Sequence, residues 1–303
     1  MAGAATARSL VEAGHAVRVF DKGRGVGGRM ATRRTESGLR FDHGAQFLRA
    51  RGDGLRARRD AWVARGVAAP WGGESRFVGV PGMTAPVRDL LDGLPVALET
   101  TITRLARDAA GWTLTDAEGT ATGPFAAVAV TFPAPQVAAL TAASGLLLPG
   151  PERAAYAPCW SLMLALDAEP GFRDDRLALA DGPIALVSRE ASKPGRDAGH
   201  RLVAHASPAW SRAHLEEPRA AVRDALIAEL GKVLGRTLRP AYAAAHRWRY
   251  AMVETALGEA CLYDPGQRLG AAGDWCLGPR IEAAFDSGRA LAGRIVANLK
   301  AAR

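Results

Sequence analysis

A glycine-rich loop with two arginines is the part of the sequence best suited to bind a charged ligand. Glycines at positions 23, 25, 27 and 28 allow a tight backbone path, and Arg24 and Arg29 accompany them. A guanidinium group meets phosphate with two parallel hydrogen bonds. A second small-residue turn, residues 44–46, follows the loop. The pattern predicts a site for a phosphate-bearing ligand; a solvated glycine-rich loop is the alternative.

The residues before this loop resemble part of a dinucleotide-binding unit. Residues 4–14 indicate a small-residue helix and residues 16–20 a buried strand, and Asp21 follows directly. In a Rossmann unit, an acidic residue at this place accepts hydrogen bonds from a ribose. The strand and Gly-x-Gly turn that open such a unit do not precede the helix, so Gly3 corresponds to its last glycine. We therefore expect that the natural protein begins upstream of Met1 and that this chain binds its dinucleotide weakly.

A second segment with similar chemistry lies near the C-terminus. Residues 269–272 predict a short strand, Asp274 follows it, and residues 281–299 predict a small-residue helix. The N-terminus of a helix offers free amide groups and a positive dipole to an anionic ligand. An aspartate in a turn also caps helices, so this segment points to a ligand only together with the N-terminal loop.

These three segments together resemble the flavin-binding signature of the amine-oxidase-like flavoproteins, in particular the short renalase-like branch. The resemblance implies FAD as cofactor, with Asp274 on its ribityl chain and the 281–299 helix pointing at the N1 and O2 edge of the flavin. The cofactor-binding residues that it implies are Gly3, Asp21, Lys22, Arg24, Gly28, Arg29, Met30, Gly44, Ala45, Gln46, Ile102, Gly273, Asp274, Ile281, Glu282 and Ala284.

The same resemblance places candidate catalytic side chains around the flavin ring. It implies that Gln46 faces the isoalloxazine and that a strand at residues 243–253 lies beside it in the substrate domain. Alternation along this strand puts His246, Trp248 and Tyr250 on one face and two arginines on the other. These four residues are the predicted catalytic group. The alternative is an amphipathic strand that packs Trp248 into the core.

The reaction implied by the resemblance is oxidation of an isomeric dihydronicotinamide, a 2- or 6-dihydro form of NAD(P), by hydride transfer to flavin. Molecular oxygen then reoxidises the flavin and yields hydrogen peroxide. A flavin amine oxidase is one alternative, and it would hold a neutral amine near the ring. A carotenoid-type desaturase shares the motifs, but a longer chain with a membrane-binding surface is expected there. A truncated, flavin-free scaffold without activity is the alternative from another class.

Composition agrees with a folded cytoplasmic enzyme and disfavours several other classes. The chain has 303 residues, 48% of them hydrophobic and 23% charged, with a formal net charge of +8. Three widely spaced cysteines predict no disulfide framework, and six histidines without ligand spacing predict no metal. Arginines interspersed with acids, without a recognition motif, predict no nucleic-acid binding. Pro133 and Pro135 interrupt the uncharged segment 125–148, so no membrane contact is predicted, and no oligomeric state is predicted either.

The predicted fold class is α/β, with an FAD/NAD(P)-binding Rossmann-like domain interleaved with an α+β substrate domain. Residues 1–50, 79–139 and 260–303 are assigned to the FAD-binding domain, and residues 51–78 and 140–259 to the substrate domain. Further predicted strands lie at 126–131, 162–166, 184–187 and 201–206, and further helices at 85–91, from 136, and at 218–234. The active site is expected where the two domains meet.

Overall fold

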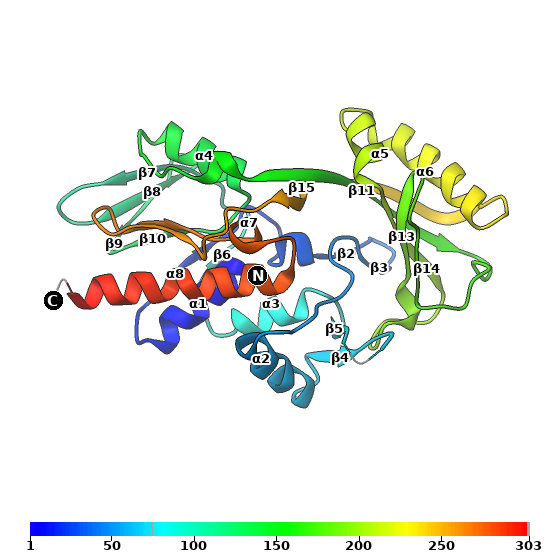
Figure 1. Ribbon diagram of the computed structural model, residues 1–303, viewed down its shortest axis with the longest axis horizontal. Coiled ribbons are helices and arrows are strands. Elements are labelled where there is room, and N and C mark those ends of the chain that lie inside the picture. The colour runs from blue at the N-terminus through cyan, green and yellow to red at the C-terminus, as the bar shows by residue number, and fades with distance from the viewer. Residues whose placement is uncertain (74, 302–303) are drawn as a thin grey trace.

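A five-stranded antiparallel sheet is the largest element of the structure, a computed structural model that describes residues 1–73 and 75–301 (Figure 1). Its strand order is β12–β13–β14–β11–β15. The strands are β11 (Ala155–Leu166), β12 (Arg176–Ala178), β13 (Ile184–Arg189), β14 (His200–Ala206) and β15 (Pro240–Thr255). The strands predicted at 162–166, 184–187, 201–206 and 243–253 all lie within these elements, so their existence and type are confirmed.

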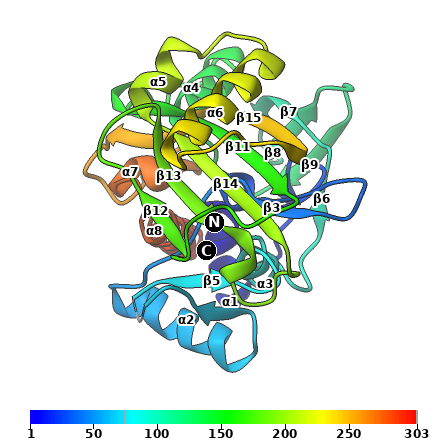
Figure 2. The same cartoon turned by 90° about the vertical axis from the view of Figure 1, so that its right-hand side faces the viewer.

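Alternation along the strands gives this sheet two different faces. One face carries Leu162, Leu164 and Leu202, which pack with Val222 and Leu226 of helix α6 (Arg219–Val233). The predicted helix at 218–234 is thereby confirmed. In Figure 2, α6 and α5 (Pro208–Ala213) lie on one side of the sheet, and β3 (Arg40–Asp42) lies on the other. The face turned away from α6 is therefore available to build a site against the N-terminal part of the chain.

The nucleotide-binding region consists of short parallel strands flanked by two long helices. β1 (Val19–Phe20) pairs with β6 (Val96–Ala97), and β10 (Val128–Val130) pairs with β17 (Leu269–Ala271), both in parallel. β16 (Leu262–Asp264) adds an antiparallel strand beside β17. Helix α1 (Ala2–Glu12) lies along helix α8 (Ile281–Ala301) in Figure 1. Parallel strands joined through helices agree with the predicted α/β class.

The two helices approach each other closely near their N-terminal halves. A Cβ atom at Gly288 of α8 would overlap the backbone oxygen of Ala2, so only glycine permits this crossing. The hydroxyl of Thr6 donates to the carbonyl oxygens of Ala2 and Gly288, each at 3.0 Å. This contact brings the starts of α1 and α8 into one neighbourhood, where the sequence predicts the cofactor.

Several predicted boundaries differ from the structure; the strand predicted at 126–131, for example, is regular only over Val128–Val130. Helix α1 spans Ala2–Glu12 instead of 4–14, because Gly14 at φ +85° ends it. Helix α4 (Ala134–Ala143) begins two residues before the predicted start, with a proline in its first turn. The strand predicted at 16–20 is regular only over Val19–Phe20, since β6 is the one strand that pairs with it in residues 1–73 and 75–301. The strand and two glycines expected upstream of the chain stay a prediction.

The remaining elements complete the framework around these two regions. The other strands are β2 (Thr32–Arg34), β4 (Ala68–Pro70), β5 (Phe77–Gly79), β7 (Ile102–Arg107), β8 (Trp112–Asp116) and β9 (Ala121–Phe125). The other helices are α2 (Asp53–Ala64), α3 (Ala85–Leu90) and α7 (Asp274–Leu277), with short 3-10 turns at Gly28–Met30, Pro151–Arg153 and Glu190–Ser192. Hairpins β2–β3 and β4–β5 and the sheet β7–β8–β9 are antiparallel.

Packing links residues 51–78 to the nucleotide-binding region. Trp62 and Trp71 are buried in the same apolar cluster as Ala4 of α1 and Leu90 of α3. The proposed division into two domains stays a prediction. Within the residues that the structure describes, no helix has the length and apolar character to cross a membrane, and no group of three or more His, Cys, Asp or Glu side chains is arranged to hold a metal.

Candidate functional site

The glycine-rich loop and the turn at residues 44–46 touch each other directly. The amide of Ala45 donates to the carbonyl oxygen of Arg29 at 2.8 Å. A Cβ atom at Gly44 would overlap that same oxygen, so glycine is required for the two backbones to meet. Gly27 and Gly28, at φ +127° and +55°, give the loop its turn before Arg29. The two segments that the sequence singled out thus form one continuous surface.

Arg29 crosses from this surface to the C-terminal segment. Its guanidinium group donates to both carboxylate oxygens of Asp274, at 2.6 and 2.7 Å, and to the carbonyl oxygen of Ala251 in β15 at 3.0 Å. Burial alone lowers the pKa of an arginine, but the adjacent Asp274 carboxylate raises the pKa of Arg29. One bidentate pair therefore joins the two predicted halves of the cofactor site.

The N-terminal end of α1 lies at the same place. A Cβ atom at Gly3 would lie 2.6 Å from Oγ1 of Thr131, the residue after β10, so glycine brings the helix against the strand end. Burial lowers the pKa of the Met1 α-amino group to about 6, and charges on Arg29, Asp274 and Asp21 also act on it. Three predicted cofactor residues therefore surround the start of α1.

Asp21 ends β1, as the sequence predicts. Its Oδ1 accepts a hydrogen bond from the amide of Gly23 at 2.8 Å, and no partner for its Oδ2 is found within the described parts of the chain. The free oxygen fits a ribose hydroxyl.

The other predicted cofactor residues surround these contacts at varying depth. Met30 is buried, Ile102 begins β7, and the amide of Gly273 donates to the Ser287 hydroxyl at 3.0 Å. Glu282 is buried, and its Oε1 accepts the amides of Arg51 and Gly52, each at 2.7 Å, which ties the segment before helix α2 to α8. The exposed residues of the loop include Lys22, Arg24 and Gly28. Ile281 and Ala284 lie in the first turn of α8. Their contacts with a cofactor stay predictions.

On the substrate side, the free face of the large sheet carries a row of polar residues. In register across three neighbouring strands lie His205 of β14, Ser161 of β11 and His246 of β15. Residues paired across antiparallel strands project to the same face, so this row faces β3 and the turn at residues 44–46. The His246 ring lies 4.8 Å from the ring of His43, which follows β3.

Trp248 lies in the next row and anchors the sheet to the turn. Its Nε1 donates to the carbonyl oxygen of His43 at 2.8 Å, and its ring lies 4.3 Å from that of His246. Tyr250 lies 5.6 Å from Tyr156, which itself lies beneath the Arg29 guanidinium. The structure thus gathers His246, Trp248 and Tyr250 toward the cofactor residues.

The predicted alternation along β15 is confirmed by its two arginines. Arg247 and Arg249 bind Glu216, at 2.9 and 2.7 Å, away from the imidazole row.

The imidazoles of the site are held in their neutral form. Burial lowers the pKa of His43, His205 and His246 to about 4 in each case. Nearby positive charges act in the same direction, Arg33 on His43 and His246, and Lys193 on His205. A neutral imidazole donates one hydrogen bond and accepts another. His43, His205 and His246, called the imidazole wall below, therefore offer donors and acceptors without a charge.

Behind the imidazoles lies a buried cluster of four charges. Lys193 Nζ lies 2.5 Å from Glu190 Oε1 and 3.2 Å from Asp42 Oδ2, and Arg196 lies 2.5 Å from the same Asp42 oxygen. Burial alone raises the pKa of Asp42, but Lys193 and Arg196 lower it to about 2. For Glu190, burial dominates and raises the pKa. The cluster ties β3 to the segment between β13 and β14.

Gln46 belongs to this cluster. Its Oε1 accepts Lys193 Nζ at 2.9 Å, and its Nε2 donates to the carbonyl oxygens of Asp42 and Gly44. The side chain is buried, so the structure places Gln46 as a brace of the turn. Its predicted contact with the flavin ring stays a prediction.

Sequence reasoning did not single out several residues that the structure brings to this site, namely Asp42, His43, Glu190, Lys193, Arg196 and His205. Lys193 is one of only four lysines in a chain with many arginines, which is the one signal that sets it apart. The others join the site through strand register and long-range pairing, which leave no local spacing in the sequence.

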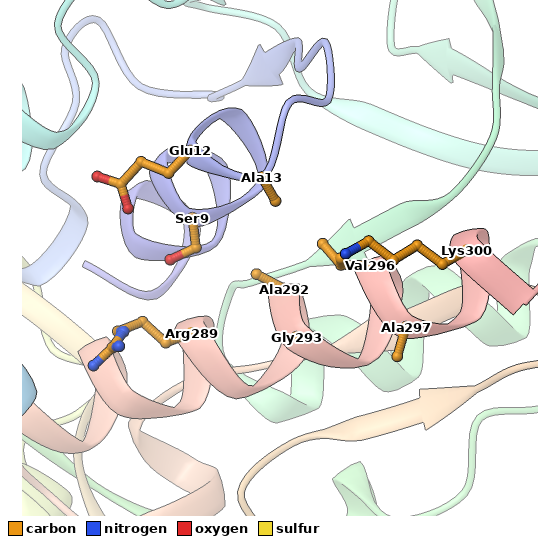
Figure 3. A pocket seen from close by; sticks show the side chains of 9 residues that line it. All are labelled: Ser9, Glu12, Ala13, Arg289, Ala292, Gly293, Val296, Ala297 and Lys300. Carbon is orange, nitrogen blue, oxygen red and sulfur yellow. The ribbon is translucent and has the colours of Figure 1, made fainter.

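A surface groove lies apart from this site. About 510 Å³ in volume, it runs between α1 and α8 (Figure 3). Its lining residues are Ser9, Glu12, Ala13, Arg289, Ala292, Gly293, Val296, Ala297 and Lys300. The cofactor residues lie near the opposite, N-terminal ends of these helices. The groove therefore does not belong to the predicted catalytic site.

Family models agree with the fold and site described above. A model of the NAD(P)-binding Rossmann-like domain matches residues 1–61, and a model of the flavin containing amine oxidoreductases matches residues 57–296. Fold and site therefore define a flavin-dependent oxidoreductase with a Rossmann-like nucleotide domain. The chain belongs to the flavin-containing amine oxidoreductase family. The predicted α/β fold class and the predicted cofactor, FAD, are thereby confirmed.

Two solved structures show the same fold at low sequence identity. Cyclohexylamine oxidase from Brevibacterium oxydans IH-35A is 12% identical with a TM-score of 0.69, over 99% of this chain and 97% of that chain. A protein described as putative protoporphyrinogen oxidase from Exiguobacterium sp. 255-15 is 17% identical with a TM-score of 0.56, over 76% of this chain. The chain spans 53% of the length of that second protein.

The residues present fit FAD. Asp21 offers a free carboxylate oxygen at the strand end, and Gly3 and Gly44 keep the backbone open at two points of close approach. Arg29 and Asp274 bind each other, and among the described residues the remaining guanidinium N–H groups and carboxylate lone pairs are left for a ligand. This combination of acceptors for hydroxyl groups, donors for phosphate and helix N-termini matches a flavin dinucleotide.

Proposed function

We propose that this chain is an FAD-dependent oxidase of the renalase-like type, acting on a 2- or 6-dihydro isomer of NAD(P)H. When bound, FAD supplies a two-electron acceptor, so that the donor loses one hydride to become NAD(P)+ while oxygen and one proton become hydrogen peroxide. The donor and oxygen are the proposed partners, without nucleic acid or membrane. A cytoplasmic location is part of this proposal and rests on the three free cysteines.

The chain's own residues hold the cofactor and exclude water in this proposal. Asp21 accepts ribose hydroxyls, and Asp274 accepts those of the ribityl chain. Arg29 would donate to phosphate, and the N-terminus of α8 would stabilise negative charge that develops on the bound flavin. Trp248 covers the turn at residues 44–46 through its bond to His43, which keeps solvent from this side.

The uncharged imidazole wall is the observation that carries the choice of donor. His43, His205 and His246 are neutral at pH 7, and the neighbouring charges that lower their pKa values are Arg33, Arg219 and Lys193. The nearby carboxylates of Asp42 and Glu190 are already paired. Such a wall suits a neutral carboxamide with phosphates beyond it, and it offers no carboxylate to an alkylammonium ion.

Hydride transfer also requires no strong acid or base from the protein. The donor passes both electrons with the hydrogen, so no base has to take a proton at the reacting carbon. Three imidazoles with pKa values near 4 are weak bases, which agrees with this demand. Their role in the proposal is to orient the ring and its carboxamide by hydrogen bonds.

A flavin amine oxidase is the second candidate. The family description and the fold likeness to cyclohexylamine oxidase over 99% of this chain favour it. Trp248, Tyr250 and Tyr156 supply aromatic surface of the kind that a neutral amine requires.

Anaerobic mixing of the FAD-saturated protein with each donor separates the two candidates. We expect 2- or 6-dihydro-NAD(P) to bleach the flavin absorbance rapidly, and cyclohexylamine to leave it unchanged. His246→Gln keeps a neutral hydrogen-bonding side chain and should raise KM more than it lowers kcat. Rapid bleaching by the amine alone would contradict the proposal and favour the amine oxidase.

A further inference from the structure

A second positively charged site lies beside the catalytic turn, around the ring of Phe47. The guanidinium carbon of Arg49 lies 5.3 Å from the ring centroid, and those of Arg76 and Arg176 lie 5.9 Å from it. Arg49 follows the turn itself, Arg76 precedes β5, and Arg176 begins β12. Three segments that are distant in sequence thus bring their arginines to one aromatic ring.

None of these three arginines is neutralised within the residues 1–73 and 75–301. They form no ion pair there, whereas Arg29, Arg65 and Arg196 each bind a carboxylate. Among the described residues, the buried Nε atoms of Arg49 and Arg76 have no hydrogen-bond partner. Buried donors are normally satisfied, and three positive charges lie around one ring without a carboxylate partner from these residues, so the arrangement indicates an anionic ligand.

A cavity of about 340 Å³ opens beside two of these arginines, Arg76 and Arg176. Its lining residues are Gly72, Arg76, Asp174, Asp175, Arg176 and Ala178. Gly72 lies at φ +59°, and a Cβ there would lie 2.9 Å from Asp175 Oδ2 and 3.1 Å from Arg76 Nη2. Glycine therefore leaves space between a guanidinium group and a carboxylate. A simple anion would meet repulsion from that carboxylate, so a larger ligand with two kinds of group fits better.

A dinucleotide carries both kinds of group. Its diphosphate accepts hydrogen bonds from guanidinium forks, and its ribose hydroxyls donate to carboxylates. In this cavity, Arg76 and Arg176 lie on one side, and Asp174 and Asp175 supply acceptors.

The cavity connects to the catalytic turn by direct contacts. Phe47 follows Gln46, the Trp71 ring lies 6.2 Å from that of Phe47, and Lys193 Nζ lies 5.5 Å from the Trp71 ring. Gln46, Trp71 and Lys193 are buried, so these contacts join the cavity to the catalytic turn by packing.

We propose that Arg76 and Arg176 bind the diphosphate of the dinucleotide donor, with Asp174 and Asp175 on its ribose hydroxyls and the charge of Arg49 near Phe47 adding to the attraction. This inference rests on the proposed function for the identity of the donor. It adds a recognition site outside the flavin-binding residues, which favours a dinucleotide over a mononucleotide as donor.

Calorimetric titration of the FAD-saturated protein with inorganic pyrophosphate tests the arginine cluster. We expect binding by the wild type, and a loss of affinity of about tenfold or more in Arg76→Met and in Arg176→Met. Arg173→Met, an exposed arginine of the same segment, is the matched control and should bind as the wild type does. Absence of binding by the wild type, or unchanged binding by both variants, would overturn the site. Neither Arg76 nor Arg176 has a side-chain hydrogen bond to any residue in 1–73 or 75–301, so thermal melts of both variants should match the wild type.

ADP-ribose separates a dinucleotide site from a simple phosphate site. Because FAD saturates the cofactor site, added ADP-ribose reports on the second site. It should bind more tightly than pyrophosphate. Asp175→Asn should weaken ADP-ribose binding, because a hydroxyl acceptor is lost, and tighten pyrophosphate binding, because the repelling carboxylate is removed. Equal affinity for both ligands would overturn the dinucleotide assignment. If arginine-dependent ADP-ribose binding is found but no dihydronicotinamide reduces the flavin, the proposed function fails and the recognition site stands.

Discussion

The cofactor side and the substrate side of the site are built in different ways. On the cofactor side, short segments meet through glycine backbone and one ion pair, Arg29 with Asp274. On the substrate side, His205, Ser161 and His246 come together only through the register of three strands, and a buried charge cluster supports them from behind. Local backbone geometry thus defines the place of the cofactor, whereas sheet register and long-range pairing define the pocket beside it.

Removing the central charge of the buried cluster should have the largest effect. Lys193→Met leaves the carboxylates of Asp42 and Glu190 with one cation between them, and breaking a buried pair costs about 3–5 kcal/mol of unfolding free energy. Urea denaturation measures this loss. Lys232→Met removes an exposed pair with Glu229 and should cost less than about 1 kcal/mol. Equal stability of the two variants would show that the cluster does not support the substrate side.

Adding a methyl group at Gly44, where the turn at residues 44–46 meets the glycine-rich loop, should have the second largest effect. Gly44→Ala forces the turn away from the Arg29 carbonyl oxygen, which costs about 1–3 kcal/mol of unfolding free energy, as overpacking does, and should weaken FAD binding. Gly25→Ala is the matched control, because no atom lies within 4 Å of the added carbon. Denaturation and FAD titration of both variants provide the measurement. Equal FAD affinity in the Gly44→Ala and Gly25→Ala proteins would show that the contact between Gly44 and the Arg29 carbonyl oxygen is not needed for FAD binding.

Acid should destabilise the substrate side through its imidazoles. The pKa values of His43, His205 and His246 are lowered from 6.5 to about 4, chiefly by burial. The unfolded chain therefore takes up protons that the folded chain does not, so stability falls as pH drops from 6.5 to 4 and the effect levels off below that. Urea midpoints at pH 7.5, 6 and 5 follow the loss, and His205→Asn should reduce it by about one third. Equal midpoints at pH 7.5 and 5 would contradict neutral, buried imidazoles.

The smallest effect is expected at the centre of the imidazole row. The Ser161 hydroxyl is buried and has no hydrogen-bond partner among the described residues, so Ser161→Ala should change unfolding free energy by less than about 0.5 kcal/mol. Ser144→Ala provides the contrast. Its hydroxyl bonds the Leu140 carbonyl oxygen and the Leu105 amide, and its loss should cost about 1 kcal/mol. A clearly destabilised Ser161→Ala protein would mean that this hydroxyl has a partner in the folded chain.

The sequence was most informative where function depends on local backbone. Gly3, Gly44 and Asp21 stand in motifs whose spacing is set by a single turn, so their places could be predicted. The alternation along β15 likewise predicted that Trp248 and Arg247 face opposite ways, because a strand has a period of two residues.

The rest of the site could not be predicted, for physical reasons. Lys193 and Asp42 are 151 positions apart in the chain, and only the packing of one region on the other makes them partners. Gln46 and Glu282 were assigned to the cofactor, but their side chains are held by Lys193 and by the start of α2. A residue type and its spacing do not reveal which of several polar groups will take it as partner.

Titration of FAD into the purified chain, followed by flavin fluorescence, tests the central claim most directly. We expect saturable binding that Asp274→Asn weakens by about tenfold or more. The substitution removes the charge of the carboxylate that binds Arg29 and that accepts hydroxyl groups of the cofactor. Asp286→Asn on α8 is the matched control and should leave binding unchanged. Equal FAD affinity in the Asp274→Asn and Asp286→Asn variants, or no binding by the wild type, would contradict the cofactor site described here.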